Sequence, residues 1–258
     1  MMKSYTLPTA ILLISLFADA AVSQQTDAGA APRTGELQLT FTLTEVAGAE
    51  AASAAESIVA PDEPIEWKLY VPDNYDPERP AGLIVFISPS NSGDIQRQWK
   101  SVLDSRNMIW ICAEQSGNRV KVSRRALFAF IAPTIAGSQY RIDSHRIYLS
   151  GFSGGSRVAG MVAADYPGLF KGAIYMGGVN SLDDHPPRQI ELFSQNRYVF
   201  ITGEYDHARD QTRRVQRQYV ESGIENSDLM DIQDMGHEKP DDRYFKRAID
   251  YLDERSAM

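Results

Sequence analysis

Three residues in the second half of the chain are of the types that together turn a serine hydroxyl into a nucleophile. Ser153 lies in the sequence GFSGG, Asp206 follows the apolar run RYVFITG, and His237 lies in DMGHEKP. A serine hydroxyl attacks a carbonyl efficiently only when an imidazole accepts its proton and a carboxylate orients that imidazole. The order serine, aspartate, histidine therefore predicts a catalytic triad for acyl transfer.

The glycines around Ser153 favour a nucleophile over a plain glycine-rich bend. The motif G-x-S-x-G, residues 151–155, is weak evidence alone, but it follows the apolar run RIYLS and opens a stretch rich in small residues. Because glycine adopts sharp, close-packed turns without a side-chain clash, a strand, this turn and a helix can lift the hydroxyl clear of a sheet. We expect Ser153 to lie on such a turn.

Two residues of one loop could supply the acid. Asp206 comes directly after a predicted strand, at the edge of a parallel sheet where active sites collect. Glu204 on the same loop is a weaker substitute. Asp206 could instead cap a helix that begins near Ala208, a frequent role for aspartate. The order of the three motifs favours the catalytic role.

His237 is the preferred base among the four histidines. His145 precedes the serine and His185 precedes the aspartate, whereas in this order the histidine comes last. His207 adjoins Asp206 and is badly placed to turn back toward it. His237 could be a solvated loop residue, but it alone fits both the order and the position after the last predicted strand.

The negative charge of a tetrahedral intermediate needs hydrogen-bond donors. One donor is expected to be the backbone N–H of Gly154, the residue after the nucleophile. The second should come from the loop after the strand GLIVFIS, which reads PSNSGD. Pro89 has no N–H, so Ser90 is the candidate, with Asn91 behind it. Either residue could equally belong to a plain polar loop.

The rest of the sequence predicts the elements that position these residues. Segment 37–46 alternates apolar and polar residues and segment 65–72 ends in a proline, which predicts two antiparallel strands. Further strands are predicted at 82–88, 108–114, 146–150, 171–178, 197–203 and 228–235. Helical stretches separate them, and a last helix covers about 241–254. The alanine-rich segment 47–57 could be a loop or a short helix.

This alternation predicts an α/β fold. We expect a mostly parallel central sheet with helices on both faces, antiparallel strands at its N-terminal end and no large lid. Residues 36–258 are expected to form a single domain, preceded by a flexible segment at 24–35. The length of 258 residues suits one domain better than two.

The start of the chain has the pattern of a secretory signal peptide. Residues 1–23 contain Lys3, an apolar run at 10–17 and then small residues. The run is too short to span a bilayer, for which about 20 residues are needed. An ordinary buried helix is the alternative. We expect an exported protein, periplasmic or secreted.

Composition excludes several classes of protein and of site. A net charge of −8 argues against nucleic acid as a partner. Cys112 is the single cysteine, so an internal disulfide is excluded, and it is expected to be buried. The four histidines are widely spaced with no cysteine cluster, so neither a metal nor a cofactor is predicted. The sequence leaves the oligomeric state open.

At this point several segments together resemble a known superfamily. YVPDNYDPERPAGLIVFI, YRIDSHRIYLSGFSGGSRVAG, YPGLFKGAIYMGG, ITGEYD and GH are similar to the α/β-hydrolase superfamily. The resemblance covers roughly residues 65 to 255 and is strongest to secreted esterases of the feruloyl esterase and polyhydroxyalkanoate depolymerase type. It implies a Ser153, Asp206, His237 triad that hydrolyses carboxylic esters, or less often peptide bonds, through an acyl-enzyme. The implied partner is a small or polymeric ester.

Two departures from the resemblance matter. Members often have His-Gly in the first oxyanion loop, where this chain has Ser88 and Pro89. Arg157 stands where a small or apolar residue is expected; it is either a surface residue, which we favour, or a cation directed at the site. A serine exopeptidase of the same fold and a hydrolase-like binding protein without turnover are the alternative functions.

Overall fold

An eight-stranded sheet organises the part of the chain that the computed structural model describes, residues 32–254. The strand order is β1-β2-β4-β3-β5-β6-β7-β8. The strands are β1 (Gly35–Phe41), β2 (Ile65–Val71), β3 (Ala81–Ile87), β4 (Met108–Ala113), β5 (Ile142–Phe152), β6 (Gly172–Met176), β7 (Arg197–Gly203) and β8 (Ser227–Ile232). The predicted signal peptide at 1–23 lies outside the described residues.

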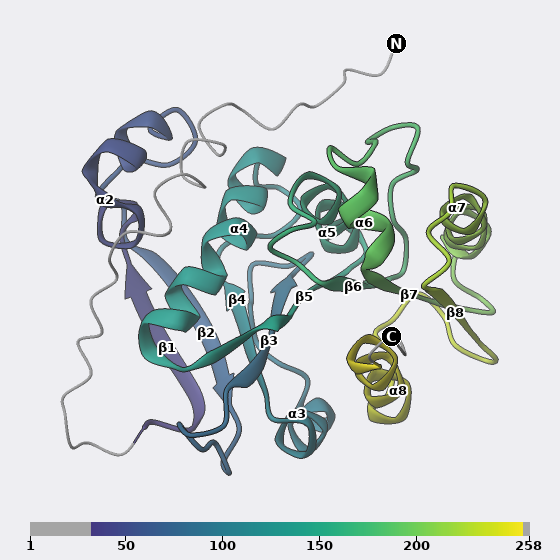
Figure 1. Ribbon diagram of the computed structural model, residues 1–258, viewed down its shortest axis with the longest axis horizontal. Helices are drawn as coiled ribbons and strands as arrows, with labels where there is room; N and C mark the ends of the chain where they lie inside the picture. The colour runs from purple at the N-terminus through teal and green to yellow at the C-terminus, as the bar shows by residue number, and fades with distance from the viewer. Residues whose placement is uncertain (1–31, 255–258) are drawn as a thin grey trace.

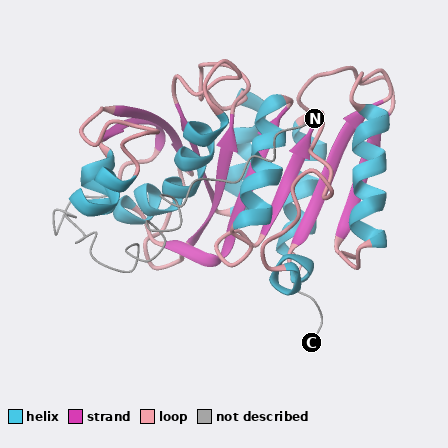
Figure 2. Cartoon of the chain, turned by 90° about the horizontal axis from the view of Figure 1, so that it is seen from above, coloured by secondary structure: helices cyan, strands magenta, loops and turns pink. Residues whose placement is uncertain are grey.

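Only the N-terminal end of the sheet is antiparallel. β2 pairs antiparallel with both β1 and β4, and every other neighbouring pair, from β4 to β8, is parallel. The parallel strands lie side by side in Figure 2, with helices in front and behind. The predicted mostly parallel sheet with antiparallel N-terminal strands is therefore confirmed.

The first predicted strand was too long. β1 ends at Phe41, and helix α2 (Leu43–Ala54) begins two residues later. The Thr42 side chain accepts a hydrogen bond from the amide of Glu45, and the Glu45 carboxylate accepts one from the amide of Thr42. This capping box starts a helix where the alternating pattern alone predicts more strand. The helix bends at Gly48, which has a φ of 81°.

Helices cover both faces of the sheet (Figure 1). One face packs against α2, α4 (Val122–Gln139), α5 (Gly154–Asp165) and α7 (Arg209–Glu221). The other face packs against the short 3-10 turn at Arg97–Trp99, α3 (Lys100–Arg106) and α8 (Asp242–Asp253). Trp99 and Phe245 stack at 4.1 Å in the core of this second face. Burial on both faces explains why the parallel strands read as continuous apolar runs.

The connection between β6 and β7 contains little regular secondary structure. It contains one helix, α6 (Ile190–Gln195), and no large lid is built from the residues between these two strands. Within residues 32–254, no helix has the length and apolar character that crossing a bilayer requires. Ser153, Asp206 and His237 follow β5, β7 and β8, so the parallel topology brings all three to one edge of the sheet.

Cys112 is expected to be chemically inert in the folded protein. It is 1 % exposed on β4, and burial raises the pKa of its thiol to about 12. Because the thiolate is the reactive form, a thiol-specific disulfide reagent should leave the native protein unlabelled at mildly alkaline pH. The same reagent should label one thiol per chain in guanidinium chloride. Rapid stoichiometric labelling of native protein would contradict this burial.

Candidate active site

Ser153 occupies a strained turn between β5 and α5. Its φ is 53° and its ψ is −121°, a conformation that residues with a side chain rarely adopt and that tends to occur at functional sites. Its backbone N–H donates a 2.8 Å hydrogen bond to the carbonyl of Met176 on β6, which anchors the turn to the sheet. A Cβ atom on Gly151 would lie 2.5 to 2.6 Å from backbone atoms of Gly155 and Ser156, so the turn closes only with glycine there.

Ser153, His237 and Asp206 form one continuous chain of hydrogen bonds. Nε2 of His237 lies 3.0 Å from the Ser153 Oγ, and Nδ1 of the same ring lies 2.8 Å from Oδ1 of Asp206. The ring of Phe152 packs beside the imidazole at 4.8 Å between ring centroids. One ring nitrogen therefore faces the hydroxyl and the other faces the carboxylate, as proton transfer from a serine requires.

The carboxylate of Asp206 is buried and fully engaged. Its side chain is 1 % exposed, and it accepts hydrogen bonds from the Thr202 hydroxyl at 3.2 Å and the Ala208 amide at 2.8 Å. Ala208 is the N-cap residue of α7, so Asp206 binds the start of this helix without being its cap residue. These bonds hold the carboxylate in one orientation toward His237.

The other candidate residues take no part in this chain of hydrogen bonds. Glu204 accepts a hydrogen bond from the Asp234 amide instead. His145 lies at the far end of β5, and His185 faces Asp165. His207 is 73 % exposed and lies 3.8 Å from Asp206, with its ring 4.0 Å from that of His237.

The two expected oxyanion donors differ in their surroundings. Gly154 is the first residue of α5, so its amide has no acceptor within the helix and faces outward at the positive end of the helix dipole. The Ser90 amide instead donates to the hydroxyl of Ser88 at 3.2 Å. The Ser90 amide is therefore engaged within its own loop.

Arg125 of α4 is a buried cation that the sequence analysis did not single out. It is 3 % exposed and donates to three backbone carbonyls: Ser116 at 2.9 Å, Ser88 at 2.8 Å and Gly154 at 3.3 Å. No carboxylate lies within ion-pair distance of it among residues 32–254, and desolvation lowers the pKa of its guanidinium. It ties the loops after β3 and β4 to the first turn of α5. Nothing in the sequence SRRAL distinguishes it from its neighbour Arg124.

Arg157 lies one helical turn after Ser153 and is half-buried. Its guanidinium donates a 2.7 Å hydrogen bond to the side-chain carbonyl of Gln211 on α7 and lies close to Gly178. The favoured interpretation as a plain surface residue is therefore too simple, because Arg157 links two helices at this edge of the sheet.

Asp206, His207 and His237 are the one grouping of potential metal ligands found among residues 32–254. Ligand atoms of Asp206, His207 and His237 all lie within 4.8 Å of one another. Two of the three, Asp206 and His237, already hydrogen bond to each other through Oδ1 and Nδ1. This geometry fits a base that faces a serine hydroxyl and is oriented by a carboxylate better than it fits metal coordination.

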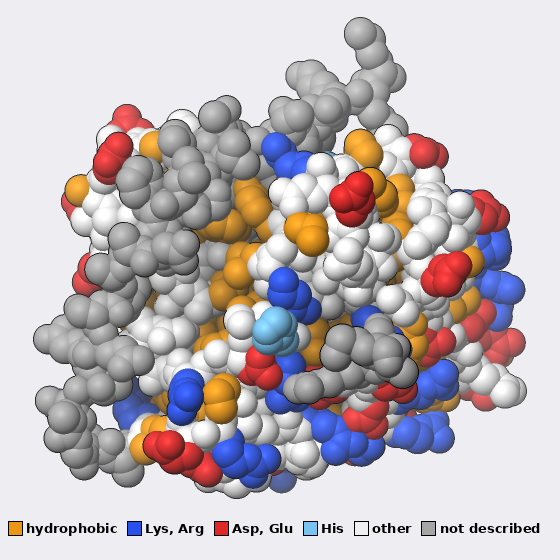
Figure 3. All heavy atoms as spheres, viewed as in Figure 1, with side chains coloured by type: hydrophobic (Ala, Val, Ile, Leu, Met, Phe, Trp, Pro, Cys, Tyr) orange, Lys and Arg blue, Asp and Glu red, His pale blue; other side chains and the backbone are white. Residues whose placement is uncertain are grey.

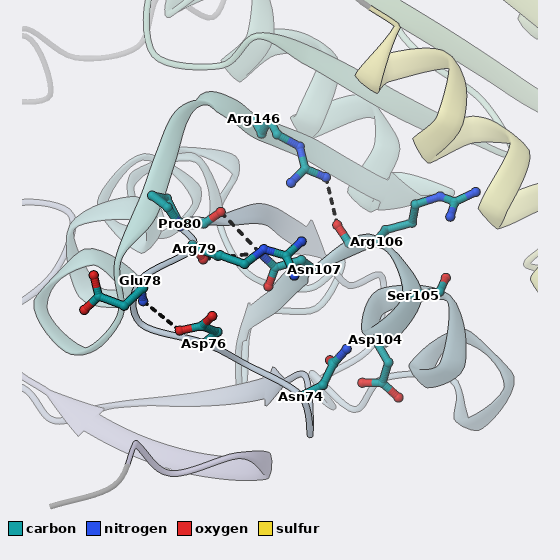
Figure 4. A pocket seen from close by; sticks show the side chains of 10 residues that line it. All are labelled: Asn74, Asp76, Glu78, Arg79, Pro80, Asp104, Ser105, Arg106, Asn107 and Arg146. Carbon is teal, nitrogen blue, oxygen red and sulfur yellow. Dashed lines mark hydrogen bonds between the residues drawn. The ribbon is translucent and has the colours of Figure 1, made fainter.

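A cavity of about 620 Å³ lies away from these residues, at the opposite edge of the sheet (Figure 4). It is lined by polar side chains such as Asp76, Arg79, Asn107 and Arg146, near the amino ends of β3, β4 and β5. Cationic and anionic side chains are also interspersed over the face shown in Figure 3. The lining of the cavity does not include Ser153, whose hydrogen-bonded chain with His237 and Asp206 lies at the edge where the parallel strands end.

Sequence comparison and fold comparison give different results. No model of a protein family matches the sequence, and no match is found among curated proteins. A mutant feruloyl esterase module from Clostridium thermocellum, complexed with sinapinate, has a TM-score of 0.64 at 13 % identity, covering 90 % of this chain and 92 % of that one. A poly(3-hydroxybutyrate) depolymerase from Bordetella parapertussis has a TM-score of 0.58 at 13 % identity, covering 80 % and 85 %.

Longer proteins share the fold over part of their length. A thermostable esterase has a TM-score of 0.54 at 18 % identity, and this chain spans only 54 % of it while 77 % of this chain is covered. Dipeptidyl peptidase 4 of Porphyromonas gingivalis has a TM-score of 0.54 at 20 % identity over 74 % of this chain and 33 % of its own. The chain has the α/β-hydrolase fold.

Replacement of Arg125 should destabilise the protein more than replacement of its neighbour. In Arg125→Met, two buried carbonyls and one partly buried carbonyl lose their donor, and we expect the free energy of unfolding to fall by about 2 to 4 kcal/mol. The matched control is Arg124→Met, which removes a partly exposed ion pair with Glu63 and should have an effect of about 1 kcal/mol or less. Urea denaturation measures both. Equal losses for the two variants would contradict the role of Arg125.

Proposed function

We propose that the protein is an exported serine hydrolase that cleaves carboxylic esters through an acyl-enzyme. The observation that carries this proposal is the hydrogen-bonded chain from the Ser153 Oγ through both ring nitrogens of His237 to the buried Asp206. The strained turn at Ser153 and the Gly154 amide, which has no acceptor among residues 32–254, support it. The proposal assigns nucleophile, base and acid to the residues expected from the sequence.

In this mechanism, Ser153 attacks the ester carbonyl carbon while Nε2 of His237 accepts the hydroxyl proton. Asp206 stays ionised and stabilises the imidazolium through Nδ1. The carbonyl oxygen becomes an oxyanion, toward which the Gly154 amide donates. His237 then returns the proton to the departing alcohol as the C–O bond breaks. In deacylation, water attacks the acyl carbonyl while His237 accepts a proton from the water. His237 then returns that proton to the Ser153 Oγ as the acyl group leaves.

An ester is favoured over a peptide as substrate. Matched proteins described as a feruloyl esterase, a depolymerase of poly(3-hydroxybutyrate) and a thermostable esterase support an ester, and two of them are covered over most of their length. The match to a dipeptidyl peptidase keeps a peptidase as the second candidate, but this chain spans only a third of that protein. The absence of a large lid suits small and polymeric esters alike.

Export is proposed from residues 1–23 alone. A cation, an apolar run and small residues at the start of the chain have the composition of a secretory signal peptide. Expression of the full chain followed by N-terminal sequencing of the released protein would test this, and cleavage near Ala21 to Gln24 is expected.

Substitution of the triad should abolish ester hydrolysis without unfolding the protein. Ser153→Ala and His237→Ala should each lower kcat for p-nitrophenyl acetate by about 10⁴-fold or more, because the nucleophile or its base is lost. A fluorophosphonate probe should label the wild type and fail to label Ser153→Ala. His145→Ala is the matched control: it removes an exposed imidazole at the far end of β5 and should leave kcat within a few-fold.

The outcomes separate the candidate functions. Hydrolysis of dipeptide p-nitroanilides in preference to esters would favour the peptidase. Folded wild-type protein that neither hydrolyses these substrates nor reacts with the fluorophosphonate would exclude the enzyme and favour a hydrolase-like binding protein. Circular dichroism of each variant establishes that the fold is intact.

A further inference from the structure

The proposed mechanism still needs a second donor for the oxyanion. A tetrahedral intermediate is held by at least two hydrogen-bond donors in sites of this kind, and each is worth a large factor in rate. Gly154 offers one backbone amide, whereas the Ser90 amide is engaged with the Ser88 hydroxyl. The identity of the second hydrogen-bond donor to the oxyanion is inferred here on the basis of the proposed function.

The side chain of Asn118 reaches the turn from the loop after β4. Asn118 is exposed, and its backbone N–H donates a 2.9 Å hydrogen bond to the carbonyl of Pro89. Within the described part of the chain, its carboxamide has no hydrogen bond to another residue. An exposed carboxamide beside Gly154, with its donor unused among residues 32–254, is available to a bound group.

The Asn118 carboxamide is packed directly against Gly154. A Cβ atom on Gly154 would come closest to Oδ1 of Asn118, and it would lie 2.7 Å from Cγ and 2.9 Å from Nδ2, closer than such atoms approach in proteins. Gly154 does not have a positive φ, so its backbone conformation alone does not demand glycine. The Asn118 side chain fills the space that a side chain at position 154 would occupy, so a larger residue there would have to displace it.

We propose that Nδ2 of Asn118 donates the second hydrogen bond to the oxyanion, beside the amide of Gly154. As the Ser153 Oγ bonds to the carbonyl carbon, the C=O π electrons move to the oxygen and the serine proton passes to His237. The new negative charge then accepts N–H bonds from both donors. Nδ2 and Oδ1 exchange places by a half-turn of the terminal torsion, so Asn118 keeps a donor beside Gly154 in either orientation.

The loop that carries Asn118 is held in place before any substrate binds. The Gln115 amide donates to the carbonyl of Asn91 at 2.8 Å, and the Gly117 amide lies 3.3 Å from the side-chain oxygen of Asn91. Arg125 binds the carbonyl of Ser116 from the buried side. These contacts fix the backbone of the loop in advance, so stabilising a developing charge needs little reorganisation of the chain.

Two substitutions of Asn118 test the proposal. Asn118→Ala removes the donor, and Asn118→Asp keeps the shape but replaces the amide with an anionic acceptor. With p-nitrophenyl acetate, both should lower kcat by about 10²-fold to 10³-fold, because the bond is made to the transition state. KM should change little. The control is Arg119→Ala at the next exposed position of the same loop, which should keep wild-type kcat and KM.

A tetrahedral inhibitor separates a donor from a purely structural residue. Phenylboronic acid accepts the Ser153 Oγ at boron and forms an anionic tetrahedral adduct. Its inhibition constant should rise about 10²-fold in Asn118→Ala, in parallel with the loss of kcat. Gly154→Ala should displace the Asn118 side chain and give a similar loss, and adding Asn118→Ala to it should cause little further loss because both changes remove one interaction.

The results distinguish failure of this inference from failure of the proposed function. An inactive wild type that does not react with the fluorophosphonate would overturn both. An active wild type with Asn118→Ala and Asn118→Asp within threefold of it in kcat and in boronate inhibition would overturn the inference alone. Losses from Gly154→Ala and Asn118→Ala that multiply fully in the double variant would also contradict it. Thermal unfolding of each variant shows that the losses do not arise from unfolding.

Discussion

The backbone turn at Ser153 is the constraint on which the rest of the site depends. A residue with a side chain is held at a φ of 53° between β5 and α5, in a conformation that is stable only when its surroundings enforce it. The enforcement comes from three directions: the Met176 carbonyl receives the Ser153 amide, Arg125 holds the Gly154 carbonyl, and Gly151 leaves room for the turn to close. Only this geometry presents the hydroxyl to His237.

Arg125 is a buried cation that supports the edge of the sheet where Ser153 lies. Burying a guanidinium without a carboxylate is unfavourable unless its N–H groups are satisfied. Here three carbonyls satisfy them, and each belongs to a different segment around the nucleophile. The Arg125 guanidinium therefore connects the loops after β3 and β4 to the start of α5. Without it, these segments would be free to move separately.

Much of the fold follows from local patterns, and the main error has a local cause. Each of the eight strands overlaps a predicted one, since apolar runs buried on both faces are distinctive. The strand predicted over 37–46 includes the start of α2, because a two-residue alternation overlooked the capping box formed by Thr42 and Glu45. The alanine-rich segment 47–57 could have been a loop or a short helix from its sequence, and it is partly helical. The capping box that starts the helix lies upstream of this segment.

The residue types and their order along the chain were enough to predict the proposed nucleophile, base and acid, because each follows a recognisable strand and parallel strands end at one edge. The sequence could not predict how side chains meet across loops. Ser90 was expected as a donor by position, yet its amide is taken by Ser88, while Arg125 and Asn118 come from segments far from Ser153 in sequence. Contacts between separate loops depend on three-dimensional packing, which no local pattern encodes, so only the tertiary structure decided them.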